Sequence, residues 1–242
     1  MNLALVNEIE EFWNEKMLEV GNAKQIHSIG LPTMRLKILP NELDSSCETV
    51  CRPVIANWSD DHGIVGYAQA AMVGPRRSGR AIDAISLLME LDNVSQESYD
   101  FAELLVESHV DQNPFKCTSD GPRWLVDFRK LEVHPSRLGN KLGVRLGAQF
   151  LDELRQLFKI GLFVLKPYPL QYSRGDGPRV FQSAEENPQQ FQKDSQKLRQ
   201  LYCNAWGAAA LPGTDDHLFV LGSTKHTLVP RKGGRNWSLE QF

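Results

Sequence analysis

The sequence predicts an α/β protein built on one mixed β-sheet flanked by helices, and two observations support this prediction. An apolar run over 124–133 is followed by a glycine-containing turn, by helical spacing of apolar residues over 144–158, and by a second apolar run over 161–167. A strand, a crossover helix and a strand in this order predict a parallel pair. Runs over 64–73 and 81–91 are neighbours in sequence, which favours an antiparallel pair.

Length and composition limit the possible classes of protein and partner. The chain has 242 residues, of which 41% are hydrophobic and 24% charged, so it can bury a substantial core as a single domain over 1–242. The net charge of −3 disfavours a general nucleic-acid binder. No apolar run approaches the roughly 20 residues needed to cross a bilayer, and the acidic N-terminus lacks the basic region of a secretory signal. We therefore expect a cytoplasmic protein with no nucleic-acid or membrane partner.

The elements expected before the first long strand are mostly helical. Apolar residues of 3–20 recur on one face, which predicts an extra N-terminal helix within an extension over 1–32. Met34–Leu39 alternates apolar and basic residues, as a half-exposed strand does. A helical region is expected to begin at Asn41 and to run to about Asn57, before a turn at 60–63.

The remaining elements follow along the chain. We expect a basic hairpin loop over 74–80, a helix over 98–110 capped by Ser95, a polar loop over 171–189, a helix over 192–205, a strand over 217–222 and a loosely attached tail over 223–242. The polar loop is either a substrate lid or a simple connection. The C-x3-C of Cys47 and Cys51 does not have the usual spacing of a zinc knuckle, and we expect no metal.

The glycine turn between the strand 124–133 and its helix has the features of an anion site. The strand ends at Pro135, the turn contains Gly139, and the helix is expected to open at Gly143. A helix start leaves several backbone N–H groups without partners, and the helix dipole adds partial positive charge there. A phosphate or diphosphate suits such a place. Arg137, Lys141 and Arg145 are expected to supplement these backbone donors.

This stretch resembles the acyl-CoA-binding loop of the GNAT acyltransferase superfamily. Val133 and Pro135 match the end of the family's strand, Gly139 matches an extra glycine that many members have, and Gly143 matches the last signature position. A second stretch, 197–213, is similar to the family's late motif, in which an aromatic-bearing helix ends in Gly-Phe.

The sequence departs from the family pattern at three places. Leu138 stands where an Arg or Gln is usual, and Lys141 stands where the first signature glycine is usual. In the late motif Gly207-Ala208 replaces Gly-Phe. Arg137 is the basic residue adjacent to the altered first position, and we expect it to compensate for Leu138.

The resemblance covers roughly 34–222 and implies a GNAT-like fold whose two parallel strands splay at their ends. It implies acetyl-CoA as co-substrate, with its pantetheine arm between the splayed strands and its diphosphate on the turn. The residues expected to bind the cofactor are Leu131, Val133, Arg137, Leu138, Gly139, Asn140, Lys141, Leu142, Gly143 and Asn204.

The catalytic groups that the resemblance suggests are Tyr202 as acid and Glu132 as base. The family's tyrosine lies four residues before the glycine of Gly-Phe, a position that Cys203 holds here, and Tyr202 precedes it. A buried carboxylate on a central strand has a raised pKa, which suits a base. The other candidate bases are Asp127, Glu90, Asp92, His134 and a water molecule. Because side chains alternate along a strand, Asp127 and Glu132 are expected to face opposite ways.

Two functions remain open from the sequence. The first is an acyl-CoA-dependent N-acyltransferase that passes an acetyl group to a small-molecule or peptide amine. The second is a catalytically silent GNAT-like module that binds acyl-CoA or a protein partner. A homodimer is compatible with either function.

Overall fold

The computed structural model describes residues 23–40, 49–75, 89, 99–100, 103, 124–169, 187–210, 217–222, 226–230 and 237–241. The expected helix over 3–20, the loop over 76–80, the cap at Ser95 and the loop over 171–186 lie outside these residues. So do three residues named above as candidate functional groups, Cys47, Glu90 and Asp92.

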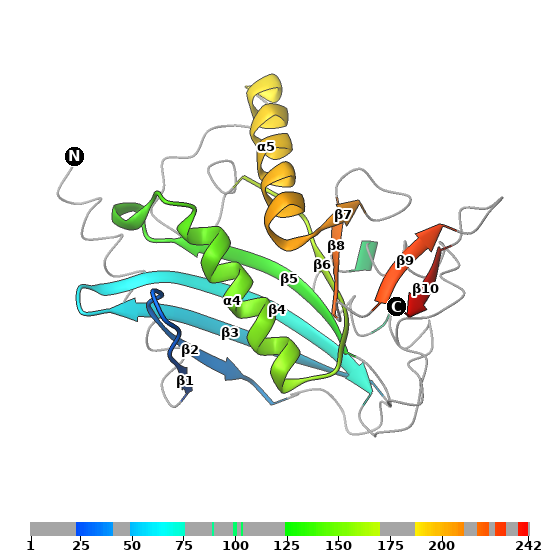
Figure 1. The fold of residues 1–242 in the computed structure, drawn as a ribbon, viewed down its shortest axis with the longest axis horizontal. Coiled ribbons are helices and arrows are strands. Elements are labelled where there is room, and N and C mark those ends of the chain that lie inside the picture. Colours follow the sequence, from blue (N-terminus) through cyan, green and yellow to red (C-terminus); the bar gives the residue numbers. More distant parts are fainter. Residues whose placement is uncertain are drawn as a thin grey trace.

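One sheet of eight strands organises the structure, in the spatial order β1-β2-β3-β4-β5-β6-β8-β7 (Figure 1). The strands are β1 Lys24–Ile26, β2 Thr33–Ile38, β3 Thr49–Asp60, β4 Gly63–Pro75, β5 Trp124–Val133, β6 Ile160–Leu165, β7 Ala209–Ala210 and β8 Leu218–Leu221. Neighbouring strands are antiparallel except β5 and β6, which are parallel. The expected mixed sheet is therefore confirmed, with β5 and β6 as its parallel pair.

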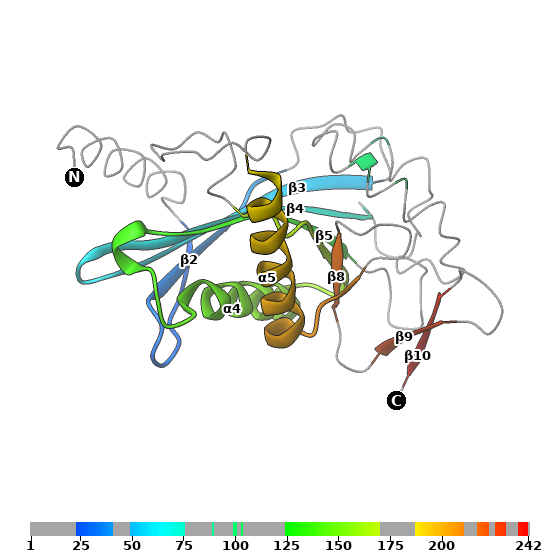
Figure 2. The ribbon, with the colours of Figure 1, turned by 90° about the horizontal axis from the view of Figure 1, so that it is seen from above.

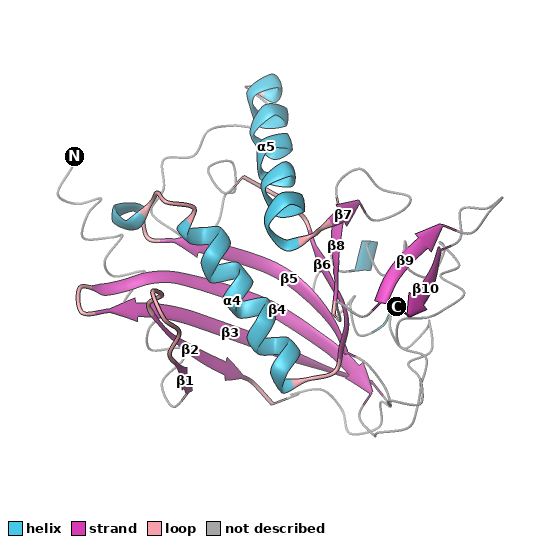
Figure 3. Ribbon diagram, in the orientation of Figure 1, coloured by secondary structure: helices cyan, strands magenta, loops and turns pink. Residues whose placement is uncertain are grey.

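The helical elements described are η1 Pro135–Arg137, α4 Leu142–Leu157 and α5 Pro188–Trp206 (Figure 3). The crossover that joins β5 to β6 contains α4, as the sequence predicts. The helix begins at Leu142, one residue before Gly143, where it was expected to open. The C-terminal stretch predicted as a loose tail instead contains two strands, β9 His226–Pro230 and β10 Trp237–Gln241, which pair antiparallel in a separate sheet.

The helical region expected over 41–57 is wrong where the structure describes it, because Thr49–Asp60 is strand β3. Val54, Ala56 and Trp58 are buried in the core beneath α4, two residues apart. That spacing is the period of a strand, which places alternate side chains on one face. The intervening residue Ile55 packs in a second cluster with Tyr67 on the other face. A strand with both faces covered lacks the polar alternation that would have identified it.

The strand expected over 81–91 is wrong at Met89, and the rest of this stretch lies outside the described residues. The structure describes only Met89 of this stretch, and Met89 is helical and 62% exposed. The neighbour of β4 is β5, paired antiparallel from Val73 opposite Leu125 to Gly66 opposite Val133. β4 therefore pairs with β5, a strand distant in sequence, and not with the run directly after it, which sequence proximity favours for a hairpin. The helix expected over 98–110 agrees with Tyr99, Asp100 and Glu103, which are helical.

The main core lies between α4 and one face of the sheet (Figure 2). Leu146, Phe150, Leu151 and Leu154 recur at helical spacing and are all buried there. Burial of each such side chain stabilises the fold by roughly 1.5–3 kcal/mol. The indole N–H of Trp58 donates to Gln149 Oε1 at 2.8 Å, which fixes α4 over β3. The N-terminal end of α4 is thereby held next to the end of β5.

Candidate functional site

The parallel strands β5 and β6 separate before β5 ends. Their pairing stops at Phe128 opposite Leu165, where β6 also ends. β5 runs on through 129–133 and keeps its pairing with β4 as far as Val133. Figure 1 shows the two ribbons diverging at this end of the sheet. The expected splay is therefore present, and the ladder between the two strands is not continuous to the end of β5.

A β-bulge in β5 lies at the point where the strands separate. Gln69 of β4 pairs with Lys130 and the next residue, Ala70, pairs with Phe128, so Arg129 is the additional residue. A bulge of this kind bends the strand and shifts the alternation of its side chains by one. On one side of the bulge Phe128 faces the core under α4, and on the other side Leu131 and Val133 do.

The bulge corrects the expectation that Asp127 and Glu132 face opposite ways. Asp127 lies opposite Ala71 and Glu132 lies opposite Tyr67, and these two β4 residues share a face because they are four apart. Both carboxylates therefore lie on the face of the sheet away from α4. Both residues are buried, at 8% and 6% exposure. The Glu132 carboxylate forms an ion pair with Lys130 Nζ at 3.0 Å.

The residues around the end of β5 fit closely against α4. An ideal Cβ on Gly143 would lie 3.2 Å from Val133 Cγ2, and one on Gly147 would lie 3.1 Å from Leu131 Cδ2. Leu131 and Val133 therefore direct their side chains toward α4. The part of β5 that faces the β6 side at this end is therefore the edge of its backbone.

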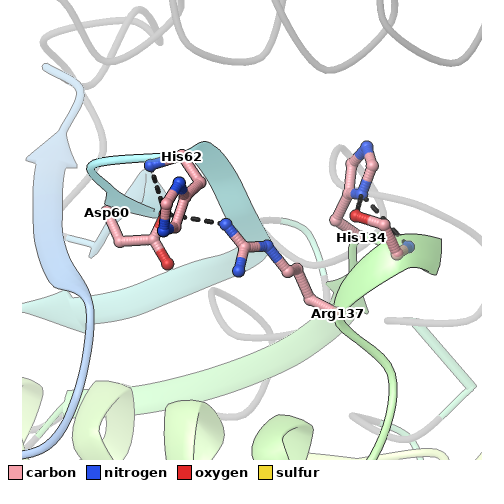
Figure 4. Close-up of polar contacts among 5 residues, drawn as sticks. Asp60, His62, His134 and Arg137 are labelled. Atoms are coloured by element: carbon pink, nitrogen blue, oxygen red, sulfur yellow. Dashed lines mark hydrogen bonds and ion pairs between the residues drawn. The ribbon is translucent and has the colours of Figure 1, made fainter.

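The turn that follows β5 is anchored at its beginning. The His134 amide donates to Val65 O at 2.9 Å, which continues the pairing with β4 by one residue. His134 Nδ1 lies 3.3 Å from the Ser136 amide and 2.7 Å from Ser136 Oγ (Figure 4). Because the amide must donate, Nδ1 accepts, and the imidazole thus caps η1. This cap fixes the position of η1, and so of Arg137, its last residue.

Three consecutive residues with positive φ lead the chain into α4. Their φ values are 128° at Gly139, 49° at Asn140 and 55° at Lys141. The left-handed region is unfavourable for most side chains, and asparagine tolerates it better than lysine. The turn is closed by the Leu142 amide, which donates to Gly139 O at 2.9 Å. Lys141 is thus the N-cap residue, in a conformation that a glycine would adopt more easily.

The first turn of α4 is not capped by a side chain. The side chain of the N-cap residue Lys141 makes no capping hydrogen bond, and the first turn contains no acidic residue. Within the described residues, Leu142 is the one member of 138–143 whose amide donates to a backbone carbonyl. The next amides, starting at Gly143, lie in the first turn of a 16-residue helix. An anion bound at a helix start accepts hydrogen bonds from amides in these positions.

The basic side chains near the turn do not all point at it. Arg137 Nη2 lies 2.9 Å from Asp60 Oδ1, at the end of β3 (Figure 4). Arg145 donates to the carbonyl of Gly30 in the β1–β2 connection. Arg137 and Arg145 thus contact other parts of the protein in this structure, and the expectation that Arg137, Lys141 and Arg145 together supplement the amides stays a prediction. Lys141 is exposed on the turn itself.

The C-terminal end of α5 docks on the first turns of α4. Trp206 Nε1 donates to Val144 O at 3.0 Å, and its ring lies where a Cβ on Gly147 would be, at 2.3 Å. Tyr202 stacks on Trp206 with ring centroids 4.2 Å apart. Tyr202 is thus brought to the α4 side of the site, whereas Glu132 lies on the other face. Asn204, expected at the cofactor, is exposed on α5.

Burial raises the pKa of Tyr202 to about 12 from its ordinary value of 10.0. The folded protein therefore keeps this phenol protonated, and the unfolded chain loses the proton first as the pH rises. This contribution to stability is present below about pH 10 and is lost as the pH rises toward 12. We expect the urea midpoint to fall less between pH 9 and pH 11.5 in Tyr202→Phe than in the wild type. Equal falls in the two proteins would contradict the prediction.

Sequence reasoning missed two residues that shape the site. Asp60 was assigned only to a turn, and Trp206 was not singled out beside its neighbour Tyr202. The contact of Asp60 with Arg137 joins residues 77 apart, so no local pattern could indicate it. Trp206 follows Tyr202 by one helical turn. Residues at this spacing lie next to each other on a helix, so the sequence did contain a signal that Trp206 lies beside Tyr202.

Two further findings concern only the described residues. No group of three or more His, Cys, Asp or Glu side chains among them is placed to hold a metal ion. None of the described helices is long and apolar enough to cross a membrane. Cys51 lies buried in β3 and Cys203 on α5, so these two thiols belong to different elements.

No protein-family model matches this chain, and no curated protein does. Among solved structures, the chain is similar to the mosquito arylalkylamine N-acetyltransferase like 5b, with 14% identity and a TM-score of 0.35, over 69% of this chain and 74% of the other. It is also similar to arylalkylamine N-acetyltransferase 2 from Aedes aegypti, with 16% identity and a TM-score of 0.30, over 53% and 66% of the two chains. Similarity at this level says nothing about the residues of the site.

Proposed function

We propose that the protein is an acyl-CoA-dependent N-acyltransferase that transfers an acetyl group from acetyl-CoA to a primary amine. The observation that supports this most is one local arrangement. The backbone edge of β5 over 129–133 extends beyond β6, and η1 and the turn after it lead into a helix start without a side-chain cap or an acidic residue. A ligand with an extended arm that contains amide groups would pair with the backbone edge of β5. A diphosphate at one end of that arm would bind at the helix start.

In this proposal the diphosphate accepts from the amides at the start of α4, beginning at Gly143. Charge-assisted hydrogen bonds of this kind are stronger than neutral ones, and the helix dipole adds to them. The pantetheine arm, which has peptide-like amides, pairs with the backbone edge next to Leu131 and Val133. The thioester then lies in the region where β5 and β6 separate.

The acceptor amine would approach from the face that holds Glu132 and Asp127. Glu132 takes a proton from the ammonium group, directly or through a water, and the amine nitrogen attacks the thioester carbonyl carbon. The C–S bond then breaks, and the CoA thiolate takes up a proton. Much of the acceleration comes from holding the two reactants together in the right orientation. A buried carboxylate face favours an acceptor that arrives with positive charge.

Tyr202 is a weak candidate for the acid because of its raised pKa. Its phenol is protonated at neutral pH, but its pKa of about 12 lies above the range of ordinary thiols. Proton transfer from it to the thiolate is therefore uphill, and water can replace it. The stacking of Tyr202 on Trp206 explains its position without any catalytic role.

The function is tested with the purified full chain in two steps. The first step measures thermal stabilisation by CoA, which reports on the cofactor before any acceptor is known. The second measures release of thiol from acetyl-CoA with a panel of primary amines. Stabilisation followed by amine-dependent thiol release supports the acyltransferase. If neither CoA nor acetyl-CoA raises the melting temperature at millimolar concentration, the proposal is wrong.

A charge reversal at Arg137 provides a sharper test of the same site. Arg137 is the cation nearest the altered first position of the turn, and Arg137→Glu would place a negative charge beside a diphosphate. We expect the Kd for acetyl-CoA to rise by roughly tenfold or more, since a like charge opposes binding where an opposite one assists it. Titration calorimetry measures this change. Lys193→Glu, a reversal at an exposed position of α5 outside the turn and the β5 edge, is the control for net charge.

The second candidate is a silent GNAT-like module that binds acyl-CoA or a protein partner without turnover. Two observations favour it: Tyr202 is held in a ring stack, and Lys141 occupies a left-handed position where the family has glycine. Stabilisation by CoA without thiol release for any amine would select this function over the first.

A further inference from the structure

The ion pair between Arg137 and Asp60 joins two separate parts of the fold. Arg137 ends η1, directly before the turn, and Asp60 ends β3 at the β3–β4 hairpin (Figure 4). Arg137 Nη2 lies 2.9 Å from Asp60 Oδ1. The same Oδ1 accepts from the His62 amide at 2.8 Å. Asp60 is therefore held by its own hairpin whether or not Arg137 is present.

The turn keeps its place without this ion pair. The His134 amide bonds to Val65 O, the Leu142 amide closes the turn on Gly139 O, and Gly143 fits closely against Val133. The side chains of Arg137 and Asp60 are 28% and 33% exposed, so solvent can replace either partner. An ion pair at such exposure contributes little to stability. Arg137 can therefore leave Asp60 at small cost.

From these contacts we infer that Asp60 competes with the bound diphosphate for Arg137 and so lowers the affinity of the protein for its cofactor. This inference rests on the proposed function, because it assigns a regulatory contact to the same turn. In the empty protein the guanidinium neutralises Asp60. When a diphosphate occupies the helix start, the guanidinium moves to it, because a diphosphate has two negative charges and accepts two parallel hydrogen bonds, whereas Arg137 contacts Asp60 through Nη2. Asp60 then keeps the His62 amide and gains water.

The consequence is that removal of the Asp60 charge strengthens cofactor binding. Asp60→Asn keeps an oxygen that accepts from the His62 amide, so the hairpin retains its bond, but it no longer competes for Arg137. We expect the Kd for CoA to fall by about two- to five-fold, which corresponds to the loss of one exposed ion pair in the empty protein. A role of Asp60 in merely holding the turn would predict the opposite sign.

A set of matched variants separates this effect from net charge. Asp61→Asn removes the same charge from the next residue of the hairpin, which is exposed. Arg137→Gln removes the partner for which Asp60 competes. The Kd for CoA is measured by titration calorimetry on the full-length wild type, the three single variants and the Asp60→Asn/Arg137→Gln double variant, with melting temperatures as the check on folding.

The inference is supported if Asp60→Asn tightens CoA binding more than Asp61→Asn does, and if its effect disappears in the Arg137→Gln background. It is overturned if Asp60→Asn leaves the Kd unchanged or raises it, or if the gain persists without Arg137. If the wild type still binds CoA in those cases, the inference is wrong but the proposed function is not contradicted. If neither the wild type nor Asp60→Asn binds CoA, the proposed function fails together with the inference.

Discussion

Gly143→Pro is expected to weaken CoA binding by one to two orders of magnitude and to leave the protein folded. Proline has no backbone N–H, so this change deletes the first amide of α4 that makes no backbone bond within the turn. A hydrogen bond to a charged group contributes about 1.5–3 kcal/mol, which corresponds to about 10- to 150-fold in Kd. Proline is tolerated in the first turn of a helix, where the donor has no helical acceptor.

Gly143→Ala is the matched control for this variant. Alanine adds a Cβ at the same place, 3.2 Å from Val133 Cγ2, so the Val133 side chain must shift slightly, but alanine keeps the N–H. The alanine variant should therefore bind CoA nearly as the wild type does. Titration calorimetry and circular dichroism on both variants provide the comparison. Equal loss in the two variants would mean that crowding at Val133, and not the amide, determines binding.

Phe150→Ala is expected to lower the free energy of unfolding by about 3–5 kcal/mol, the largest stability effect that we predict. Phe150 is fully buried at the centre of the α4 face, with its ring 5.4 Å from that of Phe128 and 6.5 Å from that of Trp58. Truncation leaves a cavity between α4 and the sheet, and neighbouring rings cannot close it without moving α4.

Leu157→Ala is the control on the same helix. Leu157 is 40% exposed at the end of α4, and we expect a loss of less than about 1 kcal/mol there. Urea denaturation monitored by circular dichroism measures both changes. If the two variants lose similar stability, the assignment of Phe150 to the centre of the core is wrong. Because α4 also provides the amides of the site, Phe150→Ala should weaken CoA binding as well.

The relation between fold and site explains why we expect such a core change to affect the candidate site. The start of α4 is placed by packing along its whole length, by the bond between Trp58 and Gln149, and by Trp206 at its first turns. The end of β5 is placed by its pairing with β4. The candidate site is the junction of these two elements, so its geometry depends on both.

The central β5–α4–β6 unit was predictable because its signals are local. The strand over 124–133, the glycine turn and the 3.6-residue period of the helix each follow from neighbouring residues, and all three are confirmed. The proposal of an anion site at the turn also rests on local features, a helix start with glycines and no acidic residue. The prediction failed at β3, because a strand buried on both faces does not alternate in polarity.

What the sequence by itself determined is therefore the order of the elements around the turn and the helix start that follows it. The tertiary structure alone decided which side chains meet there. The bulge at Arg129 turned Asp127 to the same face as Glu132, and the hairpin that ends β3 brought Asp60 to Arg137. Both outcomes depend on strand register, which is established between segments far apart in the chain and has no local signature.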